Sequence, residues 1–221
     1  MIGSWPSTSG QHEYALVFDK GREHRLLVLA PLFDEANKTR HLLVETMRRL
    51  DAAGIDVFLP DLPGCNESLA PLEQQSLESW RDAAAKAAAH FGANRLLSVR
   101  TSAVIAPNNL PGWRYAAKSG ASSLKSLLRA RTISAREAGI EESGAALIET
   151  GRQSGLDLAG YRIGPEMIRE LEVSRLADSG VLSNIDQKTI GGVAPWLRAE
   201  PDFDPAQADS LAAIIAVGIA Q

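Results

Sequence analysis

Ser98, Arg100 and Ser102 stand at alternate positions where an apolar run ends, within the stretch 94–106. The strand-turn-helix motif that presents a catalytic nucleophile reads G-x-S-x-G, because small flanking residues allow the chain to turn sharply. Serines replace both glycines here, so a tight turn is still expected. The nucleophile position holds Arg100, whose guanidinium stays protonated in proteins and cannot attack a carbonyl carbon.

Arg100 at such a turn has the chemistry of an anion-binding group. Backbone N–H groups at the start of a helix already attract anions, and a guanidinium fork matches carboxylate or phosphate oxygens. The stretch "LFDEANKTR", which follows an earlier apolar run, offers further polar groups in Glu35, Asn37 and Lys38. Together these four residues form a predicted site for a small anionic ligand.

The same residues allow a purely structural interpretation. Asp34 and Glu35 lie on this adjacent loop, and Asp61 follows the next apolar run. Any of these carboxylates could pair with Arg100, since an unpaired buried arginine costs several kcal/mol of desolvation. The sequence leaves both interpretations open.

Two other residues could act as a displaced nucleophile. Ser102 lies just beyond the turn, and Cys65 follows a predicted strand at its carboxyl end. A base for Ser102 would have to come from His41 or His90, from an unusual direction. A lone cysteine more often behaves as a small buried apolar residue, and without a base or cation nearby its thiolate fraction is small.

The sequence predicts neither a metal nor a cofactor. No group of cysteines and histidines has the spacing of metal ligands. The acidic stretch "DFDPAQAD" lacks the central glycine and closing glutamate of a calcium loop. A Gly-rich phosphate loop of either common type is also missing from the sequence.

Elements that would position these residues follow from periodicity and turn signals. The segments 13–18 and 24–31 read as two strands around the turn "DKGRE", and so as a hairpin. Further along come a polar loop over 32–40, a helix from Thr39 to Gly54, a strand over 55–64, a loop over 65–76, a helix over 77–91 and a strand entering a short helix over 94–106.

The alternation of strands and helices predicts an α/β fold. Its sheet is expected to be mostly parallel, with helices on both faces and an antiparallel hairpin at the N-terminal edge. Ligands of such sheets bind outside the carboxyl ends of the strands. The loops "PLFDEANK", "PDLPGCNES" and "VRTS" end three predicted strands, so a site is expected there.

The pattern weakens beyond Pro107. A strand is expected at 112–118, a basic amphipathic helix at 124–138 and a strand or hairpin arm at 156–163. Pro165 suits the first position of the helix 165–176. A terminal helix is expected to start at Asp204 or Pro205.

Two stretches resemble a known superfamily. "VFLPDLPGCNES" is similar to the D-x-x-G-x-G-x-S pattern of many α/β-hydrolases, with Asn66 in place of the second glycine. "VLAPLFDEANKTRH" occupies the position of their oxyanion loop. Together with "SGASSLKSLLRAR", "LAGYRI" and "PWLRAEPDFDP", these stretches resemble the exosortase A system-associated hydrolase-like proteins over most of residues 25–205. The resemblance implies an α/β-hydrolase-like fold and a role in exopolysaccharide or protein-sorting pathways.

Histidine positions bear on activity in that fold. Its catalytic triad runs nucleophile, acid, histidine along the chain. All four histidines (His12, His24, His41 and His90) precede Arg100, so a triad in this order is impossible. The sequence therefore predicts a hydrolase-like protein without classical serine hydrolase activity, which binds an anionic ligand or a partner protein. The alternative is an ester or thioester hydrolase that uses Ser102 or Cys65.

Composition limits the remaining possibilities. A chain of 221 residues with 45% hydrophobic residues fits a single domain over 1–221, with the polar residues 1–12 expected to be disordered. A net charge of −4 gives no basis for nucleic-acid binding. The apolar runs are too short to span a membrane and no signal peptide is recognised, so a cytoplasmic protein is expected.

A partner protein would need an exposed apolar patch of several hundred Å². The regions around Leu110, Trp113 and Trp196 are the first places where such a patch is expected.

Overall fold

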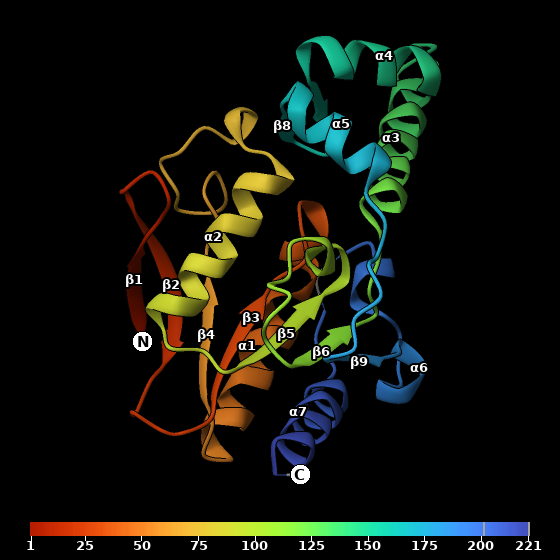
Figure 1. Cartoon of the computed structure of the whole chain (residues 1–221). Helices are drawn as coiled ribbons and strands as arrows, with labels where there is room; N and C mark the ends of the chain where they lie inside the picture. The colour runs from red at the N-terminus through yellow and green to blue at the C-terminus, as the bar shows by residue number, and fades with distance from the viewer. Residues whose placement is uncertain (201, 221) are drawn as a thin grey trace.

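A computed structural model describes residues 1–200 and 202–220, and a seven-stranded sheet forms its centre (Figure 1). The order across the sheet is β1 (Ile2–Pro6), β2 (His12–Phe18), β4 (Asp56–Pro60), β3 (Arg25–Leu29), β5 (Arg95–Val99), β6 (Gly112–Tyr115) and β9 (Leu182–Ile185). The five strands from β4 to β9 are parallel, and β1 and β2 add an antiparallel edge. The predicted fold class is confirmed.

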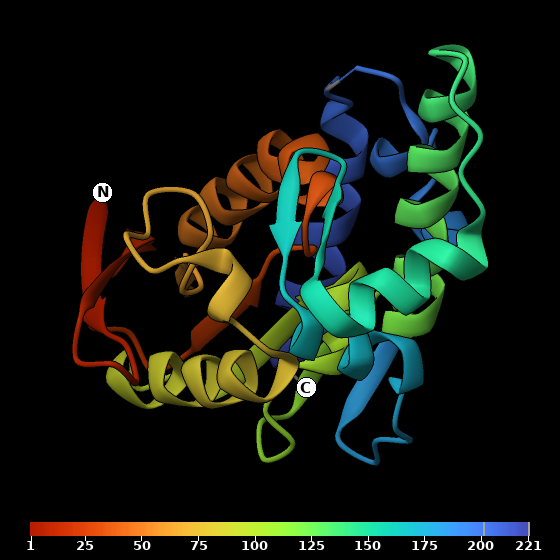
Figure 2. The same ribbon diagram turned by 90° about the horizontal axis from the view of Figure 1, so that it is seen from above.

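Helices cover both faces of the sheet. On one face, α1 (Asp34–Ala52) and α7 (Pro205–Ala220) pack in a shared apolar core, and α2 (Leu77–His90) covers the other face. The view from above shows these helices on opposite sides of the strands (Figure 2). The strands between them are buried on both faces, which explains their continuous apolar runs.

A group of elements between β6 and β9 stands above the sheet and is called here the cap (residues 120–173). It consists of α3 (Gly120–Glu137), α4 (Gly144–Ser154), the hairpin β7 (Leu156–Leu158) with β8 (Tyr161–Ile163), and α5 (Pro165–Val173). Short helical segments complete the chain: η1 (Leu72–Gln74), η2 (Arg100–Val104), α6 (Gln187–Ile190) and η3 (Pro195–Leu197). Both α4 and β9 were missed by the sequence patterns.

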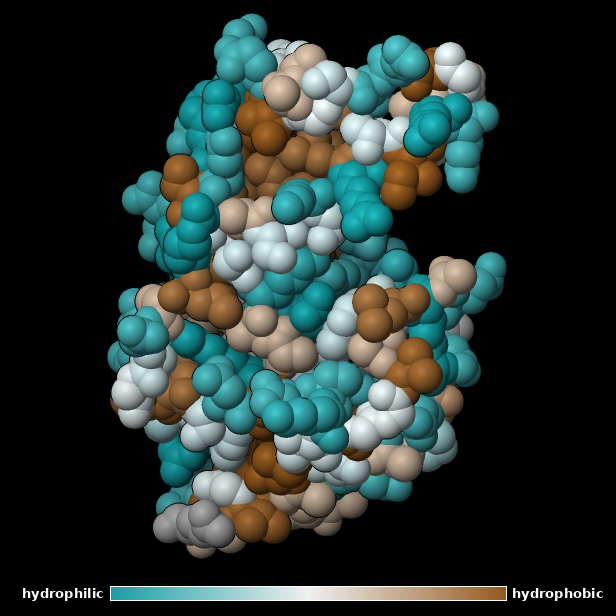
Figure 3. Space-filling model, turned by 90° about the vertical axis from the view of Figure 1, so that its right-hand side faces the viewer, coloured by the Kyte–Doolittle hydropathy of each residue, from teal (hydrophilic) through white to brown (hydrophobic). Residues whose placement is uncertain are grey.

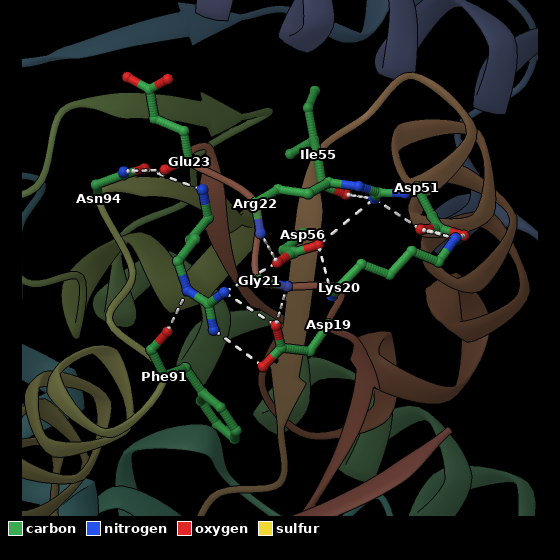
Figure 4. A network of polar contacts seen from close by, with 11 residues as sticks. Asp19, Lys20, Gly21, Arg22, Glu23, Asp51, Ile55, Asp56, Phe91 and Asn94 are labelled. Carbon is green, nitrogen blue, oxygen red and sulfur yellow. Dashed lines mark hydrogen bonds and ion pairs between the residues drawn. The ribbon is translucent and has the colours of Figure 1, made fainter.

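The predicted hairpin of 13–18 with 24–31 is wrong, although both strands exist. β2 and β3 lie on opposite sides of β4, and the antiparallel hairpin at the edge is β1 with β2. The reason is a buried carboxylate at the start of β4. Asp56 accepts hydrogen bonds from the backbone N–H groups of Lys20 and Arg22, and pairs with Arg25, so the connection crosses over β4 (Figure 4).

Residues 1–12 are not disordered as a whole, because Ile2–Pro6 forms β1. One of its side chains, Trp5, is fully buried against the core beneath α2. The polar composition of the segment concealed this strand, because only alternate residues of an edge strand face the core.

The helix expected from Thr39 begins five residues earlier, at Asp34. The predicted loop "LFDEANKTR" therefore supplies the first two turns of α1, and Thr39 donates to the carbonyl of Glu35 instead of capping the helix. Asp34 and Glu35 in the first turn suit the positive end of the helix dipole. The turn before the helix is tight, since Phe33 has φ 60° and ψ −136°.

The helix expected over 124–138 begins earlier, at Gly120, and the one expected over 165–176 ends earlier, at Val173, whereas other helix boundaries agree with the sequence. Ser76 caps α2 by accepting from the N–H of Ser79, Pro165 is the first residue of α5, and α7 begins at Pro205. None of the described helices is long and apolar enough to cross a membrane.

Candidate functional site

The turn after β5 has the geometry that the sequence predicts. Arg100 is held at φ 57°, in the left-handed region, and the chain enters the short helix η2 directly. Ser102 stabilises the turn, because its hydroxyl donates to the carbonyl of Leu29 at 2.8 Å and accepts from the N–H of Val99 at 2.9 Å. A strained residue of this kind at a strand end is a frequent mark of a functional position.

The guanidinium of Arg100 is held by groups from three other parts of the chain. Its Nε and Nη2 donate to the two carboxylate oxygens of Glu35, at 2.8 and 3.1 Å. Nη1 donates to the carbonyl of Ala116 at 2.9 Å, and the group lies 4.2 Å from the centre of the Trp196 ring. The salt-bridge alternative is therefore present, with Glu35 as the partner.

Glu35 is shared by two cations. The ammonium of Lys118 also lies 3.1 Å from this carboxylate, and it donates to the Ser126 hydroxyl at 3.1 Å. Burial by itself would raise the pKa of Glu35, but the hydrogen bonds and charges of Arg100 and Lys118 outweigh it and hold the pKa below the ordinary value. Because one carboxylate faces two cations, this cluster keeps a surplus positive charge.

The other predicted site residues lie apart from this cluster. The ammonium of Lys38 lies 3.6 Å from the carboxylate of Asp34, one helical turn earlier on α1. The side chain of Asn37 is exposed. Of the predicted ligand-binding residues, the structure thus brings together Arg100 and Glu35. Asp61, the third carboxylate considered for Arg100, pairs instead with Arg40 at 3.8 Å.

Neither alternative nucleophile is in a reactive state. The Ser102 hydroxyl is fully buried and its hydrogen bonds are used within the turn. Burial raises the pKa of the Cys65 thiol to about 12, and the carboxylates of Asp61 and Glu13 add to the shift. A thiol with such a pKa has almost no thiolate at neutral pH.

An enclosed pocket of about 80 Å³ lies where β3 and β4 end. It is bounded by the loops after the two strands, by the first turns of α1 and by Tyr161 of the cap hairpin. Its volume holds roughly two or three water molecules or one small polar group. The polar and aromatic residues that line it are Phe33, Asn37, Arg40, Asp61, Cys65, Asn66 and Tyr161.

Asp61 is the carboxyl group of this pocket. Burial raises its pKa, Glu67 raises it further, and the hydrogen bond from Asn66 at 2.5 Å and the charge of Arg40 only partly offset these effects. A carboxyl group of this kind in a cleft takes up a proton more readily than a free aspartate, which is typical of functional sites.

Several of these residues escaped the sequence patterns. Lys118 and Trp196 lie far along the chain from Arg100, and no spacing rule connects them. Tyr161 reaches the pocket because the cap hairpin folds back over the sheet. Asn66 stands where the D-x-x-G-x-G-x-S pattern has its second glycine. Its φ of 50° is a conformation that glycine adopts easily, so this substitution was a signal for the residue in the sequence.

The side chains of Leu110, Trp113 and Trp196 themselves offer little exposed apolar surface, although Val181 and Val217 near Trp113 and Leu197 next to Trp196 are exposed. Leu110 and Trp113 are each only 8% exposed, and the Trp196 ring packs between Tyr115 and Arg100. Among the described residues, no group of three or more histidine, cysteine or acidic side chains is arranged to hold a metal ion.

No family model and no curated protein sequence matches this chain. Solved structures with a similar fold include a bottromycin epimerase in complex with bottromycin A2, which aligns over 99% of this chain and 98% of its own, at a TM-score of 0.53 and 17% identity. Mouse α/β hydrolase domain-containing protein 10 aligns over 78% of this chain and 69% of its own, at a TM-score of 0.47 and 12% identity.

Other hydrolases match over a smaller part. A hydrolase from Agrobacterium vitis S4 aligns over 61% of this chain, at a TM-score of 0.44 and 15% identity. The chain spans 59% of the length of that protein and 39% of an epoxide hydrolase from Mycobacterium thermoresistibile. The sheet order and the alignment with the epimerase define the class: this chain has an α/β-hydrolase-like fold.

Proposed function

We propose that this chain binds a small acidic ligand at the carboxyl edge of its sheet and does not hydrolyse it. The observation that carries the proposal is the cluster of Arg100, Glu35 and Lys118. A cation fills the nucleophile position, and one carboxylate neutralises only part of the charge on two cations.

The pocket beside α1 supports the same proposal. Asn37 and Arg40 line it, and Asp61 can take up a proton and so donate a hydrogen bond to an anion. In the proposed site, Arg100 and Lys118 provide long-range attraction, Asn37, Lys38 and Arg40 provide donors, and Glu35 keeps Arg100 in place. Binding is expected to weaken as the pH rises through the pKa of Asp61, because its carboxylate then repels the ligand.

The fold allows a role outside hydrolysis. The bottromycin epimerase has a similar fold over nearly the whole chain, and epimerisation is not hydrolysis. The resemblance to exosortase-associated hydrolase-like proteins suggests where such a ligand belongs, in cell-envelope polysaccharide or protein-sorting pathways. A partner protein that presents an acidic side chain would satisfy the same chemistry.

The loss of hydrolysis is tested by restoring the nucleophile. Arg100→Ser is expected to give no turnover of p-nitrophenyl acetate above buffer, because all four histidines precede this position and no base is provided. Turnover that disappears in a second variant, Arg100→Ala, would contradict the proposal.

The binding role is tested with inorganic phosphate and succinate as probes, by calorimetric titration at low ionic strength. Lys118→Ala is expected to weaken binding about tenfold at low ionic strength, since the attraction of one of the two cations, about 1.4 kcal/mol, is lost. Lys188→Ala removes the same charge from an exposed position and is the matched control. If neither probe binds, or if both variants bind equally, the site assignment is wrong.

A further inference from the structure

The cap contains an apolar groove that takes no part in the site at the sheet edge. α3 and α4 form its two walls, and Glu172 at the end of α5 borders it. Leu124 and Leu128 lie along α3, and Ile148 faces them from α4. The groove has a volume of about 660 Å³, and apolar side chains gather in a hollow of the upper part of the molecule (Figure 3).

The rim of the groove carries charges of both signs, but only the negative charges are neutralised within the chain. Glu142 pairs with Arg131 through two hydrogen bonds of 2.5 and 2.9 Å. Glu172 pairs with Arg152 in the same way, at 2.6 and 2.9 Å. Both carboxylates are therefore occupied by arginines at the edge of the groove.

Two cations on the rim remain without such a partner. Lys125 and Arg129 are one turn apart on α3, both are exposed, and neither forms an ion pair with a carboxylate among residues 1–200 and 202–220. The groove therefore combines an apolar floor with a net positive rim. This combination is complementary to a molecule with an apolar body and an acidic end.

We propose that this groove binds a single-chain amphiphile with an acidic head group, such as a fatty acid. The lining residues of α3 run from Ala121 to Thr132, which is about 16 Å of helix. The acyl chain lies along Leu124, Leu128 and Ile148, and the head group meets Lys125 and Arg129.

The shape favours one chain over a membrane surface. A hollow between two helices offers side walls to a single acyl chain, whereas a bilayer would contact only its rims. The inference is independent of the site at the sheet edge, because no residue of the groove belongs to that site.

The test is a fluorescence titration of the full chain with cis-parinarate, followed by displacement with tetradecanoate and with tetradecyltrimethylammonium. One saturable site is expected, and tetradecanoate should displace the probe at least tenfold better than the cationic chain. Equal displacement by both chains would overturn the role of the charged rim, and no saturable binding would overturn the proposal.

Variants locate the site. Ile148→Glu is expected to abolish binding, because it places a charge on the apolar wall. The double variant Lys125→Glu with Arg129→Glu changes only exposed residues and should weaken binding about tenfold. Arg136→Glu, on the same helix but outside the groove, is the matched control and should leave binding unchanged.

Two further outcomes contradict the proposal. Binding unaffected by Ile148→Glu in a folded protein would place the chain elsewhere. Binding to phosphatidylglycerol vesicles without binding of monomeric tetradecanoate would identify a membrane-contacting surface instead. Circular dichroism of each variant shows whether the fold is kept.

Discussion

At the scale of single residues, the decisive feature is a permanent positive charge where the fold presents a nucleophile. A guanidinium cannot lose its proton in a protein, so its burial has to be compensated by a carboxylate or by an anion. Glu35 provides this compensation from the first turn of α1, and Lys118 shares it. The turn after β5 is thus kept in its strained form by a charge cluster.

The importance of Glu35 can be measured by its replacement with glutamine. Glu35→Gln leaves Arg100 and Lys118 without a carboxylate, and should lower the free energy of unfolding at pH 7 by roughly 3 to 5 kcal/mol. The pKa of Glu35 is lowered in the folded state, so its stabilisation is present above pH 4.5 and is lost as the pH falls through the folded value.

Urea unfolding at pH 7 and at about pH 3.5 checks this prediction, since the stability difference between the two proteins should be smaller at the lower pH. Glu45→Gln, which removes a half-buried carboxylate that pairs with Arg48 and Arg49 of the same helix, is the control and should change stability less. A constant difference between Glu35→Gln and the unaltered chain at both pH values would contradict the prediction.

At the scale of elements, the crossing of the β2–β3 connection over β4 sets the order of the sheet. The side chain of Asp56 is fully buried at the start of β4 and binds backbone N–H groups of the connection as well as Arg25 (Figure 4). This one carboxylate ties the connection and the first residue of β3 to the start of β4. Arg25 is held in addition by Asp19, which is more exposed.

Asp56→Asn is expected to destabilise the chain by roughly 3 to 5 kcal/mol, since it leaves buried donors and Arg25 without their carboxylate. Asp19→Asn removes a carboxylate from the same arginine at an exposed position, where the loss should stay below about 1 kcal/mol. Chemical denaturation at pH 7 compares the two variants. Equal losses would show that the buried carboxylate has no special part in the crossing.

At the scale of the whole molecule, the cap and the sheet share one apolar core. Leu27 and Leu96 of the sheet belong to the same buried cluster as Leu124, Leu158 and Met167 of the cap. A cap held by so continuous a core is not expected to unfold by itself.

Calorimetry tests this single-domain interpretation. We expect one thermal transition in which the calorimetric and van't Hoff enthalpies agree, because the cap and the sheet lose their common core together. Two resolved transitions, or early loss of amide protection confined to residues 120–173, would show that the cap is a separate unit.

Local signals in the sequence determined much of this protein. The period of apolar residues predicted the buried strands, and Pro165 fixed the start of α5. The order of four histidines before Arg100 predicted that the usual triad is missing. These properties depend on neighbouring residues or on chain order alone. They needed no knowledge of distant contacts.

Tertiary structure decided the rest. The choice of Glu35 over Asp34 or Asp61 as the partner of Arg100 depends on which face of α1 meets β5. The polar residues that begin α1 have the composition of a loop, and only their tertiary contacts show that they form a helix. Lys118 and Trp196 join Arg100 from 18 and 96 residues away, which no local pattern encodes. These contacts depend on the fold, because the buried charge of Arg100 has to be compensated by groups that tertiary structure places next to it.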